Sequence, residues 1–205
     1  MSVPADVLAA LTALARARRT TAPAQRSFLV VIDGPAGSGK TTLADQLAER
    51  LGDGAGGSAQ VVHLDDLYEG WESGPDGGAE RLAAWVLEPL AQNLPGVYRR
   101  YDWSSGEYAE QHEVRPAPFV VVEGCGAGAH TIAGHPHLLF WVEAPDAERL
   151  RRGLARDGEA NRAHWLAWMD DEAKHYARER TRERADVRLD GTGHVLTWPA
   201  AGRVS

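Results

Sequence analysis

A glycine-rich turn between an apolar run and a helical pattern constrains the fold of this chain more than any other segment. Residues 34–41 read GPAGSGKT, which matches all four fixed positions of G-x-x-x-x-G-K-[ST], and they follow the apolar run FLVVID at 28–33. A helical pattern at 40–51 begins inside the same segment. In this context backbone N–H groups and a helix N-terminus can cradle phosphate. The segment therefore predicts a phosphate-binding loop in an α/β fold.

Side chains of the loop are predicted to bind nucleotide as well. Only two of the 22 basic residues are lysines, and one of them, Lys40, occupies the lysine position of the motif. Its compact ammonium on a flexible stem can reach the β- and γ-phosphates, and the hydroxyl of Thr41 can bind Mg²⁺. The predicted ATP-binding residues are Gly34, Pro35, Ala36, Gly37, Ser38, Gly39, Lys40, Thr41 and Thr42.

The loop alone does not separate a kinase from a GTPase, a transport ATPase or a nucleotide sensor. The sequence has no N-K-x-D motif, which would favour a GTPase, and no L-S-G-G-Q-like signature of a transport ATPase. A net charge of −7 disfavours nucleic-acid and membrane partners. The single cysteine, Cys125, excludes an internal disulfide and is interpreted as a small buried residue. We expect a cytoplasmic protein, and homo-oligomerisation stays open.

Apolar runs of strand length alternate with helical patterns along the chain. The runs lie at 28–33, 61–65, 119–124 and 138–144, and the helical patterns at 40–51, about 78–93, about 146–157 and about 161–185. Continuous apolar strands predict an α/β fold with a parallel sheet of about five strands and helices on both faces. Residues 1–26 are predicted to form an amphipathic helix and linker before one domain over 27–205. Segments 52–59 and 69–80 are predicted to be flexible turns or loops.

Two acidic segments follow predicted strands, at the sheet edge where open α/β folds bind ligands. In HLDDLY at 63–68, Asp65 can accept the proton of a substrate hydroxyl, although a solvated loop carboxylate is the alternative. Asp66 is interpreted as a helix cap. Glu123 ends a run of valines and can orient Mg²⁺, with a surface carboxylate as its alternative. The predicted metal site is therefore Thr41, Asp65 and Glu123.

Arginines gather on one predicted helix face within residues 146–158. Arg149, Arg152 and Arg156 are spaced i, i+3 and i+7, and they repel one another unless an anion lies between them. A lid helix that closes over ATP would supply that anion, while a solvated charged face is the alternative. The aromatic stripe that includes Trp165 and Trp168 is interpreted as a packing face.

These segments occur in the order found in one family, and the chain resembles the uridine kinase-like branch of the P-loop small-molecule kinases. GPAGSGKTT is similar to its Walker A segment, LDDLY to its Q-D-S-F-Y segment, VVVEG to its strand ending in Glu-Gly, and APDAERLRRGLARDG to its arginine-rich lid helix. The resemblance implies an ATP- and Mg²⁺-dependent kinase that phosphorylates a hydroxyl. The implied catalytic residues are Asp65, Lys40, Arg149, Arg152 and Arg156.

On the substrate side the resemblance is weaker. It implies substrate binding by Tyr68, Asp76, Tyr101, Asp102 and Trp103. The family's sugar-holding D-H-P-D-A-F-D stretch is reduced here to Pro75 and Asp76, and Gly106 stands where the family has a base-reading histidine. We therefore expect uridine and cytidine to be poor substrates. A kinase for another metabolite or a nucleoside monophosphate, and a nucleotide-binding regulator with little transfer, are the alternatives.

Overall fold

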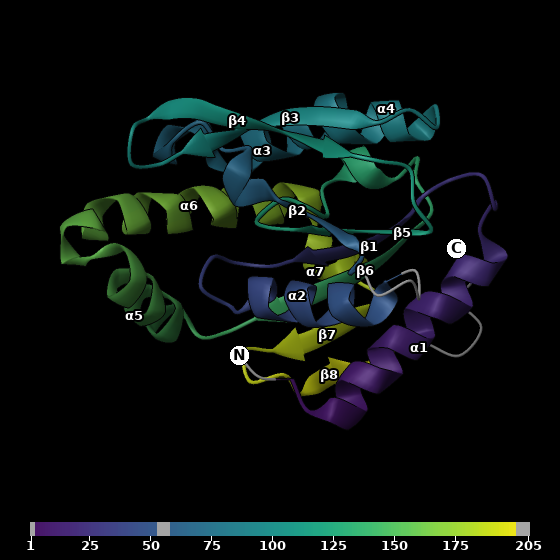
Figure 1. Ribbon diagram of the computed structural model, residues 1–205. Coiled ribbons are helices and arrows are strands. Elements are labelled where there is room, and N and C mark those ends of the chain that lie inside the picture. The colour runs from purple at the N-terminus through teal and green to yellow at the C-terminus, as the bar shows by residue number, and fades with distance from the viewer. Residues whose placement is uncertain (1–2, 53–57, 200–205) are drawn as a thin grey trace.

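A six-stranded sheet forms the centre of the molecule. The structure is a computed structural model, and it describes residues 3–52 and 58–199. The sheet order is β2–β5–β1–β6–β7–β8 (Figure 1). The strands are β1 (Phe28–Asp33), β2 (Gln60–His63), β5 (Phe119–Glu123), β6 (His137–Glu143), β7 (Val187–Asp190) and β8 (Val195–Thr197). The first five in the order are parallel, and β8 pairs antiparallel with β7. The predicted α/β fold is confirmed.

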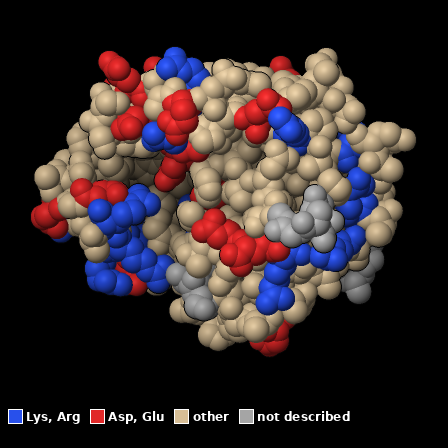
Figure 2. Space-filling model, in the orientation of Figure 1, with Lys and Arg blue, Asp and Glu red and all other residues tan. Residues whose placement is uncertain are grey.

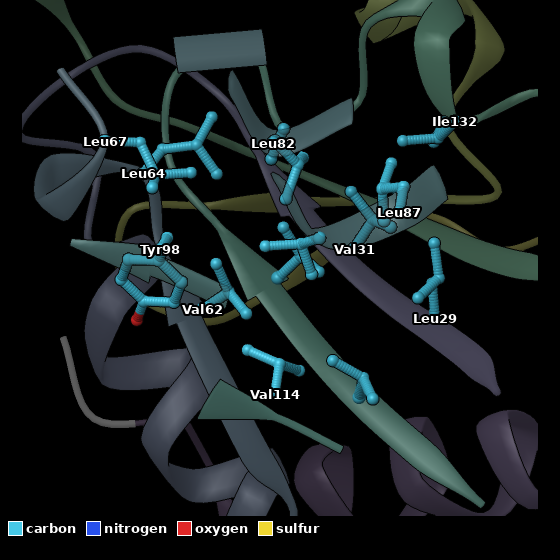
Figure 3. Close-up of a cluster of buried hydrophobic side chains, with 14 of the residues drawn as sticks. Leu29, Val31, Val62, Leu64, Leu67, Leu82, Leu87, Tyr98, Val114 and Ile132 are labelled. Atoms are coloured by element: carbon cyan, nitrogen blue, oxygen red, sulfur yellow. The ribbon is translucent and has the colours of Figure 1, made fainter. Parts of the chain in front are cut away.

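Helices cover both faces of this sheet. On one face, α1 (Ala5–Thr21) and α2 (Lys40–Leu51) share a buried cluster with Val30 and Phe140. On the other lie α3 (Gly74–Leu82), α4 (Glu88–Ala91), α6 (Arg162–Glu179) and the hairpin of β3 (Gly96–Asp102) and β4 (Glu107–Val114). Alternate residues of a strand point to opposite faces, so Val31 joins the second cluster, which Figure 3 shows.

The helical segments differ from the predicted ones at two places. The stretch 69–80, predicted to be a mobile loop, forms a 3₁₀ turn at Trp71–Ser73 and most of α3. Its Gly78 allows tight packing, because a Cβ there would lie 2.3 Å from the ring of Tyr68. A π-helical turn, Ala83–Leu87, continues α3 into α4. The single helix predicted over 161–185 is interrupted at Arg180, whose left-handed φ of 52° separates α6 from α7 (Thr181–Arg184).

Other predictions have mixed outcomes. The helix predicted at 146–157 is α5 (Asp146–Asp157). The N-terminal amphipathic helix is confirmed as α1, with Leu8 and Leu11 buried, while the division of the chain at residue 26 stays a prediction. The turn predicted at 52–59 falls largely on residues 53–57, outside the described residues.

The β3–β4 hairpin was not predicted. Within residues 3–52 and 58–199, no helix combines the length and the apolar character needed to cross a membrane.

Candidate functional site

The carboxyl ends of three neighbouring strands open into one cleft. The phosphate loop follows β1, Asp65 lies just after β2, and Glu123 ends β5. Because parallel strands end at the same edge of a sheet, these segments meet. They line a cavity of about 690 Å³ whose other walls come from the hairpin, α5 and α6. Figure 2 shows the surface hollowed on this side, between the hairpin above and α5 below.

Two buried side chains, Arg149 and Glu172, bind the backbone of Ala36 in the phosphate loop. We call this pair the clamp. The N–H of Ala36 donates to Oε2 of Glu172 at 2.8 Å, and the Ala36 carbonyl accepts a hydrogen bond from Nη1 of Arg149 at 3.1 Å. Arg149 and Glu172 form an ion pair, and both are at least 96% buried. Burial raises the pKa of Glu172, against the lowering effect of Arg149. The clamp therefore ties α5 and α6 directly to the loop.

This arrangement corrects the predicted lid. Arg149 does not line the cleft, because its guanidinium is occupied by Ala36, Glu172 and Asp146. Arg152 and Arg156 do line it. The Nη1 atom of Arg152 donates a hydrogen bond to the carbonyl of Gly37 at 3.1 Å. Two of the three predicted arginines can thus reach a bound nucleotide, and the third is a positioning residue.

Glu172→Gln is expected to destabilise the fold by about 3 kcal/mol, because the buried guanidinium of Arg149 loses its buried counter-charge. The loss lies at the lower end for a broken buried pair, since Arg149 keeps Asp146 as a partner. Urea unfolding measures the free energy, and calorimetric titration should show weaker ADP binding.

Glu159→Gln is the matched control for this prediction. It removes an exposed carboxylate that pairs with Arg162 at a distance of 2.5 Å, and neither residue lines the cleft. The unfolding midpoint should hardly move, because exposed ion pairs contribute little. Similar losses for Glu172→Gln and Glu159→Gln would contradict the clamp.

Lys40 begins α2 and lies beneath the loop, with 7% of its surface exposed. Its ammonium donates to the carbonyl of Pro35 at 3.1 Å and lies 3.6 Å from Sγ of Cys125. Burial alone would lower the pKa of Lys40, but the charges of Glu123, Asp33 and Glu172 raise it overall. The lysine is therefore charged when phosphate arrives. Cys125 is buried as predicted, and burial raises its pKa to about 12, so it stays a thiol.

A hydroxyl and a carboxylate meet where the sequence predicts the metal. Oγ1 of Thr41 donates to Oε1 of Glu123 at 3.1 Å, and Nδ1 of His63 lies 2.7 Å from the same oxygen. The hydrogen bond with Glu123 raises the pKa of His63, which sequence reasoning missed. In the described ranges, no group of three His, Cys, Asp or Glu side chains could hold an ion unaided. The oxygen pair nevertheless fits Mg²⁺, which keeps several waters and shares substrate phosphates.

Asp65 and Asp66 both line the cavity, in a 3₁₀ turn after β2. The Asp65 side chain faces the open cleft. Asp65 is exposed to the cleft, yet the protein groups crowded around its carboxyl displace water from it and raise its pKa. The charge of Glu123 raises that pKa further, and Arg156 and Lys40 oppose this. The helix cap predicted for Asp66 is wrong: the turn has no side-chain cap, and Oδ2 of Asp66 instead accepts a 3.4 Å hydrogen bond from Tyr98.

The predicted substrate residues divide into two groups. Tyr68, Tyr101 and Trp103 line the cavity. Asp76 does not, because it pairs with His175 and Arg178 on α6. Asp102 is also outside, where its Oδ1 accepts the N–H groups of residues 104 and 105 and fixes the hairpin turn. Both aspartates are therefore structural.

Ten lining residues are not among the predicted site residues. They are Asp66, Trp71, Arg100, Ser104, Cys125, Gly153, Asp157, Asn161, Trp165 and Trp168. Trp165 and Trp168 are buried, as predicted for a packing face, but they also form a wall of the cavity. Their spacing on one helix face was a usable signal, whereas Trp71 and Arg100 become neighbours of the site only through the hairpin and the turn before α3.

A phosphate loop that shares one cleft with an open carboxylate and a basic helix is typical of P-loop kinases, and comparisons with known proteins agree. A family profile described as an AAA domain matches residues 30–184. A cytidylate kinase of Solibacter usitatus is 32% identical over 152 residues, which is 62% of this chain and 65% of that protein. The chain thus spans less than two thirds of that relative's length.

Two further comparisons concern uridine kinases. The uridine kinase of Halobacterium salinarum is 26% identical over 145 residues, 64% of this chain and 63% of that protein. A structure described as a possible uridine kinase from Bacillus stearothermophilus has a TM-score of 0.65 at 20% identity, and the match covers 90% of this chain and 98% of that one. At such identity the likeness shows a shared fold. The chain belongs to the AAA domain family, with the uridine kinase-like P-loop fold that its motifs resemble.

Proposed function

We propose that this protein is an ATP- and Mg²⁺-dependent kinase that phosphorylates a hydroxyl group of a small molecule in the cytoplasm, without a nucleic-acid or membrane partner. The observation that carries the proposal is the joint position of Lys40, Asp65 and the Thr41–Glu123 pair in one cleft. A nucleotide-binding regulator would need the loop and the metal site, but it would have no use for an open carboxylate facing them.

The proposed reaction is a direct transfer. The acceptor oxygen attacks the γ-phosphorus of ATP, and the new O–P bond forms as the bond from phosphorus to the β,γ-bridging oxygen breaks. The hydroxyl proton passes to the carboxylate of Asp65, and ADP leaves. Lys40, Arg152 and Arg156 stabilise the charge that develops on the phosphoryl oxygens. Mg²⁺, when bound, adds positive charge there, and Thr41 and Glu123 are the residues that would hold it, with Asp65 beside them.

The cytidylate kinase relatives raise a second candidate, transfer to the phosphate of a nucleoside monophosphate. Such an acceptor brings a dianion, which needs unpaired cations at the acceptor end. Arg100 lines that end, but its guanidinium already binds Glu110 through two hydrogen bonds and Asp102 through a third. The paired state of Arg100 therefore favours a hydroxyl over a phosphate as the acceptor.

An ADP-release assay with saturating Mg²⁺–ATP tests the function. We expect release to depend on an added alcohol, with CMP, uridine and cytidine as poor acceptors. Gly106 lies in the hairpin turn and does not line the cavity, so no side chain replaces the family's base-reading histidine at that position. A kcat/KM above about 10⁴ M⁻¹s⁻¹ with CMP would establish the monophosphate kinase instead. ATP binding that no acceptor can convert into turnover would support the regulator.

A further inference from the structure

The acceptor end of the cleft is walled by aromatic rings. Six rings line the cavity on the side beyond Asp65: Tyr68, Trp71, Tyr101, Trp103, Trp165 and Trp168. They come from the turn before α3, from the hairpin and from α6. Six converging aromatic side chains are far more than a phosphate site requires. They indicate that the acceptor itself is recognised by ring faces.

Trp71 is the centre of this wall. Its ring centroid lies 5.3 Å from that of Trp103, 6.1 Å from Trp165 and 6.2 Å from Trp168. His164 stacks on Trp71 at 5.5 Å with an interplanar angle of 15°. The three edge-to-face contacts and the stack together fix the orientation of the indole. The wall is therefore built before any ligand binds.

Three of the six polar tips of these rings are hydrogen-bonded to the protein. The indole N–H of Trp103 donates to the Asp65 carbonyl at 2.9 Å, that of Trp165 to Asp157 at 2.9 Å, and the hydroxyl of Tyr68 to the Cys125 carbonyl at 2.7 Å. Trp168 keeps an N–H without a partner among the described residues. A polyol or a nucleobase needs both donors and acceptors. Of the tips without a partner among the described residues, those of Trp71 and Trp168 are indole N–H groups, which can only donate. Tyr68, Trp165 and Trp168 are buried, and the guanidinium of Arg156 lies over the Trp165 ring at 5.8 Å. The ring surface open to a ligand therefore comes mainly from Trp71, Tyr101 and Trp103.

The charges at this end that have no ion-pair partner are carboxylates. Asp65 and Asp66 line it, and Arg100 lines it with its charge balanced by Glu110 and Asp102. Arg156 lies over the ring of Trp165, and its charge is balanced by an ion pair with Asp157. Lys40 and Arg152 contact carbonyl groups of the phosphate loop. Ring faces carry negative electrostatic potential, so together with two carboxylates they attract a cation and repel an anion.

On this basis we propose that the acceptor is a hydroxyl-bearing organic cation, an amino alcohol whose ammonium lies among the rings around Trp71 and whose hydroxyl reaches Asp65. The inference rests on the proposed kinase function and names its substrate class. The transfer is as written above: the alcohol oxygen gains the γ-phosphoryl group, Asp65 takes the hydroxyl proton, and ADP is released. The ammonium takes no part in bond making, so its role is binding and orientation.

Matched ligand pairs test the charge alone. Choline and 3,3-dimethylbutan-1-ol have the same shape, and only choline is charged; glucosamine and glucose form a second pair. With Mg²⁺–ADP present, calorimetric titration of the wild-type protein should show at least one cation binding about tenfold more tightly than its neutral partner. Equal or tighter binding of both neutral partners would overturn the inference, and so would failure of both cations to bind.

Variants of Trp71 test whether the preference for the cation depends on the rings around this residue. Trp71→Leu removes the π face and should abolish the preference for the cation, whereas Trp71→Tyr keeps a π face and should retain most of it. Circular dichroism of each variant checks that it is folded. If Trp71→Leu is folded and keeps the full preference, the cation does not lie among these rings and the inference is wrong.

The same experiment separates this inference from the kinase proposal. Binding is measured with ADP and needs no turnover, while ADP release is measured with ATP. If a neutral alcohol is phosphorylated and no cation is preferred, the cation inference fails and the kinase proposal stands. If a cation binds preferentially and no alcohol of the panel stimulates ADP release, the kinase proposal fails while the chemistry of the pocket is confirmed.

Discussion

Replacing Lys40 with methionine is expected to lower turnover by a factor of about 10²–10³, the usual loss when one preorganised charge contact to a transition state is removed. Lys40 has its ammonium fixed beneath the loop by Pro35 and near Cys125 before nucleotide binds. Its charge therefore needs no reorganisation as negative charge grows on the transferring phosphoryl group. Acceptor-dependent ADP release measures the effect.

Methionine is preferable to alanine at this position because the side chain is buried. Only 7% of Lys40 is exposed, so alanine would remove the charge and also leave a cavity. The control is Lys174→Met, which changes the chain's other lysine, on α6, where the ammonium pairs with Asp171. Its turnover should match the wild type. Near wild-type turnover of Lys40→Met would refute the phosphate-loop assignment.

The predicted features that the structure bears out are those that local sequence determines. The glycine-rich motif fixes its own backbone, and the rule that parallel strands end at one edge brings Asp65 and Glu123 to it. A strand made almost entirely of apolar residues, such as β1, must be covered by other elements on both faces of the sheet. Four such runs in the sequence were therefore enough to predict a sheet with helices on both faces.

The features that were missed depend on partners far along the chain. The spacing of three arginines gives one helix face, but it cannot show that Arg149 meets a buried carboxylate 23 residues later. Asp76 matched a family motif, yet its ion pairs with α6 form only after α3 has packed. Likewise, the rings around Trp71 meet only in the folded chain, so the acceptor wall could not be read from sequence.

The hairpin is joined directly to the turn that carries Asp65, because the indole N–H of Trp103 donates to the backbone carbonyl of Asp65. In the proposed kinase, the residue that walls the acceptor would therefore also position the base. A ligand that orders the hairpin would thereby order Asp65. This contact uses the main chain of Asp65, and it therefore leaves the carboxylate free to take a proton.

That separation makes Asp65→Asn an informative substitution. The amide keeps the shape and the main-chain contact with Trp103, but it cannot accept the hydroxyl proton, so kcat should fall by a factor of about 10²–10⁴. ADP affinity should be unchanged or slightly tighter, because one negative charge near the phosphates is removed. Loss of rate without loss of binding identifies an interaction made only in the transition state. Single-turnover phosphorylation and ADP titration measure the two quantities.

Asp66→Asn is the matched control, since it lies one residue away in the same turn and lines the same cavity. The carboxylate of Asp66 accepts a hydrogen bond from the hydroxyl of Tyr98, and the proposed mechanism gives it no role in proton transfer. Asp66→Asn should therefore lower kcat much less than Asp65→Asn does. If the amino-alcohol inference is correct, Asp66→Asn should instead weaken acceptor binding and raise KM, because it removes one of two carboxylates beside the rings. If Asp66→Asn abolishes transfer and Asp65→Asn does not, Asp66 is the base. The hydroxyl of the acceptor then lies against the hairpin side of the turn.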